Sequence, residues 1–261
     1  MTYSFVSKEE VSDALADPAV CLQIENPLNS EQDLLRSSMV SSHLKVVSRN
    51  QSAQYNGVYE ISRVYKKDKK LAQESWKLAI TFWGDDSLLR LKGAIDQIMG
   101  IYRLEPAVSR DMNNKLYYSN RSARLGSGFG GFGQITKSVL DKFGIKREVS
   151  FGELAIEDII AAQRSVRAIE PVAYQLVSKD ISIELDDITT FYEVKSCIEK
   201  LVHKVVFRQE FSSDDLSKQS RKRLTFTVIM NLGPNPTSEQ IQDVLKKCAS
   251  MCESIPKAKV L

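Results

Sequence analysis

Four cations close together near the C-terminus have the clearest chemical potential in this chain. They are Lys218, Arg221, Lys222 and Arg223. Because they precede a run of strand-forming residues, we expect them in the loop before a strand. Ammonium and guanidinium groups in such a loop could meet RNA phosphates, and a charged, solvated loop is the alternative.

Aromatic residues of two expected strands are a second candidate for RNA contact. Phe207 and Phe226 could each stack on a base. Phe226, however, alternates with apolar residues, so we expect it in a core. Thr225 and Thr227 would then face outward on an open sheet, where single-stranded RNA could lie.

Histidine and cysteine residues form no recognisable catalytic or metal-ligating set. His43 and His203 are far apart in the sequence, and Cys248 and Cys252 are four residues apart on one face of an expected helix. The cysteines, which also include Cys21 and Cys197, show no paired spacing. We therefore predict structural histidines, buried free thiols of a reducing compartment, no catalytic residue and no metal site.

A glycine-rich segment at residues 126–133 suggests a phosphate-binding loop at first sight. Such a loop carries Lys-Ser or Lys-Thr at a fixed spacing as it opens a helix. Here Lys137 and Ser138 come too late. We expect these glycines to serve tight turns and close strand approach instead.

Composition is that of a globular protein with one or two domains. The chain has 261 residues, 43% hydrophobic and 26% charged, with a net charge of +3. So small a surplus neither demands nor excludes a nucleic-acid partner. No apolar run reaches about 18 residues, so we expect no membrane span.

The pattern of apolar residues divides the chain into two parts. In the first, we expect a helix over residues 31–50, a hairpin over 58–83 and a helix over 88–101. Residues 165–170 are the expected linker. The second part, 171–261, follows the order strand–helix–strand–strand–helix–strand, which is typical of a ferredoxin-like domain.

Short motifs in register along the chain resemble one family. The run Asn26-Pro27-Leu28-Asn29-Ser30-Glu31, followed by Leu35-Arg36-Ser37-Ser38, is similar to the NPLS-x-E…LRTSLLPGLL signature of the catalytic-like module in the beta subunit of bacterial phenylalanyl-tRNA synthetase. Residues 58–65 resemble its LFEIGRVF strand. Residues 178–182, 224–226 and 236–240 resemble the anticodon-binding domain that ends these subunits.

The resemblance implies an α+β chain with two domains. Residues 1–164 would form a class II synthetase-like antiparallel sheet module without synthetase chemistry, and residues 171–261 a ferredoxin-fold anticodon-binding domain. Family members carry further domains ahead of this point, so we expect a fragment, shortened naturally or for expression. The resemblance also implies a cytoplasmic location.

Catalysis, by this resemblance, belongs to a partner. An active class II enzyme presents an Arg-x-Glu pair where this chain reads Lys66-Lys67-Asp68, and it aims arginines at the phosphates because charge develops on pyrophosphate. We expect the lysines at a solvated hairpin tip. The implied partners are the alpha subunit, which binds ATP, magnesium and phenylalanine, and tRNA(Phe). No cofactor is expected in this chain.

Two sets of contact residues follow from the resemblance. The helix over 31–50 matches the motif that pairs synthetase modules, so we expect a subunit interface at Arg36, Met39, Val40 and Leu44, with self-association of the isolated fragment as one outcome. The RNA-binding set adds Arg208 and Lys179 to the four clustered cations. Arg208 stands where the family has an acid.

Two other functions remain open on the sequence. One is a stand-alone RNA-binding or regulatory paralogue of the synthetase, which would bind RNA as a monomer. The other is a free-standing ATP-dependent ligase, which would catalyse pyrophosphate exchange alone. A companion catalytic chain would favour the synthetase subunit over both.

Overall fold

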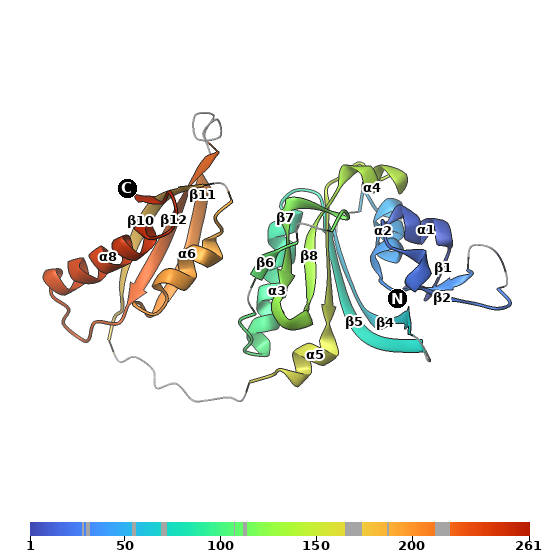
Figure 1. The fold of residues 1–261 in the computed structure, drawn as a ribbon, viewed down its shortest axis with the longest axis horizontal. Coiled ribbons are helices and arrows are strands. Elements are labelled where there is room, and N and C mark those ends of the chain that lie inside the picture. The colour runs from blue at the N-terminus through green and yellow to red at the C-terminus, as the bar shows by residue number, and fades with distance from the viewer. Residues whose placement is uncertain are drawn as a thin grey trace. The chain divides into compact units, whose positions relative to one another are not determined.

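The computed structural model describes residues 1–27, 29, 32–53, 56–68, 72–106, 108–111, 114–164, 174–186, 188–211 and 220–261. By its internal contacts the chain divides into two compact units, Met1–Val166 and Arg167–Leu261. In Figure 1 the colour runs continuously along the chain, from blue in the first unit to red at the end of the second. The expected linker, 165–170, lies outside the described residues.

The first unit is built on a six-stranded antiparallel sheet in the order β4-β5-β9-β8-β7-β6. Its strands are β4 (Gly57–Lys67), β5 (Ala72–Trp83), β6 (Val108–Arg110), β7 (Tyr117–Leu125), β8 (Gly130–Ile135) and β9 (Val149–Ala155). The helices are α1 (Lys8–Asp13), α2 (Val40–Arg49), α3 (Ser87–Ile101), α4 (Lys137–Lys142) and α5 (Ile156–Ala161), with 3-10 turns η1 (Pro18–Val20) and η2 (Gly126–Gly128).

Both faces of this sheet are covered, as Figure 1 shows for α3 and α2. Successive residues of a strand point to opposite faces. Ala79 of β5 accordingly packs in the core that holds α2 and α4, whereas Leu78 and Ile80 pack in the core that holds α3 and α5. The predicted hairpin and the predicted helix over 88–101 are confirmed.

The predicted helix over residues 31–50 is wrong in its first half. Leu34–Leu35 form β3, the middle strand of a small sheet with β1 (Phe5–Val6) and β2 (Leu22–Gln23). Arg36 continues the extended segment, because its N–H donates to the carbonyl of Ser4 and its carbonyl accepts from Tyr65. These long-range backbone bonds outweigh the local helical spacing, and α2 begins only at Val40.

Glycines of β8 allow strands to approach closely, as predicted. Gly130 has φ +120, and a Cβ placed there would lie 2.1 Å from the carbonyl oxygen of Glu153. At Gly133 a Cβ would lie 2.8 Å from Cγ of Tyr117. Larger residues would therefore separate β8 from its neighbours.

The second unit holds a four-stranded antiparallel sheet in the order β11-β12-β10-β13. Its elements are β10 (Val177–Asp186), α6 (Phe191–Ile198), β11 (Lys204–Phe211), β12 (Arg221–Met230), α8 (Ser238–Glu253) and β13 (Lys259–Val260). Both helices share one core with the sheet, including the buried free thiols of Cys248 and Cys252. Both begin with a capping box, at Thr190 and Thr237.

Candidate functional site

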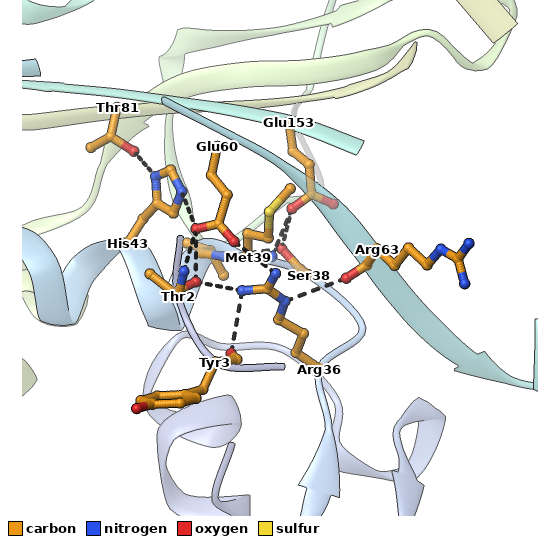
Figure 2. Close-up of polar contacts among 11 residues, drawn as sticks. Thr2, Tyr3, Arg36, Ser38, Met39, His43, Glu60, Arg63, Thr81 and Glu153 are labelled. Carbon is orange, nitrogen blue, oxygen red and sulfur yellow. Dashed lines mark hydrogen bonds and ion pairs between the residues drawn. The ribbon is translucent and has the colours of Figure 1, made fainter. Parts of the chain in front are cut away.

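A buried ion pair in the first unit joins Arg36, just after β3, to Glu60 on β4. Figure 2 shows the Arg36 guanidinium among Thr2, Glu60 and the backbone of Tyr3 and Arg63. Its Nη2 lies 3.0 Å from Oε1 of Glu60, its Nη1 donates to Oγ1 of Thr2 at 2.6 Å, and its Nε donates to the Arg63 carbonyl at 3.4 Å. Arg36 is fully buried and Glu60 is 6% exposed.

The Glu60 carboxylate is held in its charged form. Burial alone would raise its pKa, but hydrogen bonds from Arg36 and from the side chain and backbone of Thr2 lower the pKa of Glu60 below its usual range. Donors to the charged form favour that form. We therefore read this pair as an ion pair that ties the N-terminal segment to β4.

His43 on α2 lies beside this pair and stays neutral. Its Nδ1 is 2.7 Å from Oγ1 of Thr81, and its Nε2 is 3.8 Å from Oε2 of Glu60. Burial lowers the pKa of His43 to about 4; the Glu60 carboxylate opposes this shift and Arg36 adds to it. The prediction of a structural histidine is thus confirmed for His43, which is only 1% exposed.

A partly buried contact fixes the start of α2. Glu153 on β9 accepts hydrogen bonds from Oγ of Ser38 at 2.6 Å and from the backbone N–H of Met39 at 2.9 Å, as Figure 2 shows. The carboxylate therefore meets the positive end of the helix, where anions are favoured. It joins two segments that are far apart in the sequence.

The predicted subunit interface is wrong as placed. Arg36, Met39, Val40 and Leu44 are all buried within the first unit, at 0 to 3% exposure. The apolar area that suggested an interface packs against the unit's own sheet. Arg36 was expected at an interface because it falls in the motif that pairs synthetase modules, and Glu60 was not considered as its partner. The signal was present: Glu60 alternates with Val58 and Val64 on an inward face, where a carboxylate requires a cation.

The second unit places the predicted RNA-binding cations differently from expectation. Lys218 lies outside the described residues. Arg221, Lys222 and Arg223 are not in a loop but begin β12, since they pair in register with β10. Two of them meet carboxylates: Arg221 lies 3.1 Å from Glu184, and the largely buried Lys222 lies 3.3 Å from Glu210. Two of the four cations in the expected basic cluster are therefore neutralised by carboxylates on neighbouring strands.

Arg208 and Arg223 remain as the cations of the open sheet face. Arg208 sits at a bulge of β11, and its Nε donates to Oγ1 of Thr227 at 2.6 Å. Arg223 stands opposite Phe211, which is 50% exposed, and its buried Nε has no hydrogen-bond partner within the described residues. Within the described residues, neither the Arg208 nor the Arg223 guanidinium makes an ion pair.

Thr225 and Thr227 lie on this open face as expected, but both are less exposed than expected. Thr227 is not exposed, because Arg208 and Asp180 cover it and its hydroxyl donates to Asp180. Thr225 is half-buried and lies 2.9 Å from the Ser182 hydroxyl. Lys179 shares the strand face of Ile181, which the helices cover, so it does not join Arg223.

The lysines after Tyr65 are exposed residues at the end of β4, in agreement with a hairpin tip. Within the described residues, no group of three or more histidine, cysteine, aspartate or glutamate side chains is arranged to hold a metal ion. In the same part of the chain, no helix is long and apolar enough to cross a membrane.

Comparison with known proteins decides the family. Residues 1–156 match the family model described as the phenylalanyl tRNA synthetase beta chain CLM domain. The chain belongs to this family. Phenylalanine--tRNA ligase beta subunits resemble it over most of its length: that of Clostridium tetani is 23% identical, covering 91% of this chain and 32% of the relative. That of Prochlorococcus marinus is 26% identical, covering 95% of this chain and 34% of the relative.

The family member described here therefore spans about a third of the length of these relatives. Among solved structures, pyrrolysyl-tRNA synthetase from Desulfitobacterium hafniense superposes with a TM-score of 0.50 at 13% identity, over 61% of each chain. At such identity the likeness concerns the fold alone. It agrees with a class II synthetase-like arrangement of antiparallel sheet and helices.

Proposed function

We propose that this chain is the C-terminal, non-catalytic part of a phenylalanyl-tRNA synthetase beta subunit. In this role it supports a catalytic alpha subunit and contacts tRNA(Phe) in the cytoplasm. The observation that carries the proposal is the family match over residues 1–156, continued by relatives that align through the second unit. ATP, magnesium and phenylalanine would be bound by the alpha partner.

The contacts of two arginines support the proposed lack of catalysis in this chain. Arg36 is sequestered by Glu60, and Arg63 on β4 pairs with Glu74 at 2.7 Å and lies over the Trp76 ring. A synthetase needs arginines that are free to stabilise the charge developing on pyrophosphate. Arg36 is buried away from that role, and Arg63 already has a carboxylate partner.

The second unit supports the tRNA-contacting part of the proposal. Among the described residues, its β-α-β-β-α-β order and its strand order β11-β12-β10-β13 agree with the ferredoxin-like domain that we propose here. The helices cover one face and leave the other open. On that open face, Arg208 and Arg223 can meet phosphates, and the exposed ring of Phe211 can stack on a base.

The partner-facing surface must lie elsewhere than on α2. We place it at the edge strand β4, where Tyr59 is 76% and Ile61 is 45% exposed. An apolar groove of about 680 Å³ runs between this strand and α3, where Ile101 is 72% exposed. Edge strands offer unpaired backbone groups to a strand of another chain. The alpha subunit would cover this groove.

The decisive experiment is a pull-down of the tagged chain from its native extract. A companion chain that catalyses phenylalanine-dependent pyrophosphate exchange is the expected result. The variant Tyr59→Lys/Ile61→Lys should lose this companion, whereas Ile188→Lys, an equally exposed apolar residue of the second unit, should retain it. A monomer that binds RNA without a companion would instead indicate a stand-alone paralogue.

A further inference from the structure

A concave cavity of about 730 Å³ opens between the β7–β8 hairpin and the segment that contains α4. This size falls in the range of about 300–1,000 Å³ that is typical of small-molecule sites. The charged residues that line the cavity are Arg121, Lys137, Lys146, Arg147, Asp141 and Glu148. Cations thus exceed carboxylates by two, which favours an anionic ligand.

The strand register breaks at this cavity. Between Tyr117 and Ser122 the pairing of β7 with β8 shifts, so that residues 118–121 stand opposite Gln134 alone. Bulges re-aim side chains and are over-represented beside functional sites. The side chains that this bulge brings to the cavity are Tyr118, Asn120 and Arg121.

Three of the four cations are not neutralised. Lys137, Lys146 and Arg147 are exposed and make no ion pair within the described residues. Arg121 is turned toward the sheet, where it donates to Oε1 of Gln134 at 2.5 Å and lies 3.9 Å from Glu148. The three unpaired cations are therefore the groups that can bind phosphate.

The aromatic ring at the cavity is held in place. The hydroxyl of Tyr118 accepts a hydrogen bond from the backbone N–H of Lys137 at 3.1 Å, which anchors the ring to the start of α4. The side chain is nevertheless 39% exposed. An anchored and partly exposed ring beside unpaired cations is the combination that binds a base together with its phosphate.

We propose that this cavity binds a nucleotide unit, with its phosphate on Lys137, Lys146 and Arg147 and its base against Tyr118. The unit would be either a free nucleotide or one residue of a single-stranded RNA, since both present the same chemistry. This site belongs to the first unit. It depends neither on an alpha partner nor on the open sheet face of the second unit.

The test is photo-crosslinking of the whole chain with two thiouridine probes, the monophosphate and a short single-stranded oligonucleotide. We expect a labelled peptide that contains Tyr118. Labelling by the monophosphate indicates a free nucleotide as the source, and labelling by the oligonucleotide alone indicates RNA. If neither probe labels residues 114–148, the proposal is overturned, whatever label the second unit carries.

Charge variants make the test quantitative. In Lys146→Gln/Arg147→Gln the Tyr118 label from the oligonucleotide should weaken but remain measurable. The dependence of log binding constant on log salt for that signal should flatten by about 1.4 for two lost contacts to a single strand. Lys8→Gln/Lys92→Gln removes the same charge from two exposed helix positions outside the cavity and should change neither. Thermal unfolding would establish that both variants fold. Equal labelling in the two variants would overturn the proposal.

Discussion

At the scale of single residues, we expect that breaking the buried Arg36–Glu60 pair destabilises the first unit. Replacing Arg36 with alanine leaves the Glu60 carboxylate buried without its cation, which typically costs about 3–5 kcal/mol. Arg63→Ala is the matched control, because the Arg63–Glu74 pair is about half exposed and such pairs contribute roughly 1 kcal/mol or less. Urea unfolding of both variants measures the difference, and similar losses would contradict a structural role for Arg36.

His43 makes the stability of the first unit depend on pH. Its pKa lies at about 4 in the folded chain against 6.5 ordinarily, so between these values the unfolded chain binds a proton that the folded chain does not. Stability is fully present above pH 6.5 and falls as the pH drops toward 4, by up to about 1.4 kcal/mol per pH unit.

The measurement is the free energy of unfolding across this pH range. His43→Gln should flatten the slope whatever its effect on absolute stability, while His203→Gln, which changes an exposed residue of the second unit, should leave the slope intact. Because the pKa of Glu60 is also lowered, a further loss is expected in more acidic solution. An unchanged slope in His43→Gln would exclude His43 as its source.

At the scale of elements, β8 depends on glycine. Gly130→Ala would force a Cβ to within 2.1 Å of a backbone oxygen of β9, at a φ of +120. Neither backbone can move aside without a large cost in free energy. Overpacking and backbone strain together should therefore lower the free energy of unfolding by more than about 3 kcal/mol. Gly93→Ala on α3 meets nothing within 4 Å and should be neutral or stabilising by up to about 1 kcal/mol. Thermal unfolding would compare the two.

Elements with a long periodic pattern were predictable from the sequence, and short ones were not. The alternation in β12 and the helical spacing in α3 each report a buried face directly. Strand β3 has two residues and exists because β1 and β2 flank it, so no local pattern could reveal it. The cations of β12 were visible in the sequence, but the carboxylates that neutralise two of them come from β10 and β11.

At the scale of the whole molecule, the chain alone should not activate phenylalanine. Its family membership places a synthetase fold here, while Arg36 and Arg63 are engaged with carboxylates. If neither of these two arginines reaches the phosphates, the rate should fall by orders of magnitude. Phenylalanine-dependent pyrophosphate exchange by the pure chain is the measurement, with the complex from the pull-down as positive control. Exchange by the pure chain would favour a free-standing ligase.

The strand order of the first unit also delays the completion of its sheet during synthesis on the ribosome. Strand β5 ends at Trp83 and pairs with β9, which begins only at Val149. At about 5–20 residues per second, a ribosome needs roughly 3–13 s to make the intervening chain. Throughout that interval the edge of β5 that later pairs with β9 has no partner strand, and the apolar residues of the hairpin are not yet buried. Nascent chains of this protein should therefore depend on chaperones until β9 has left the ribosome.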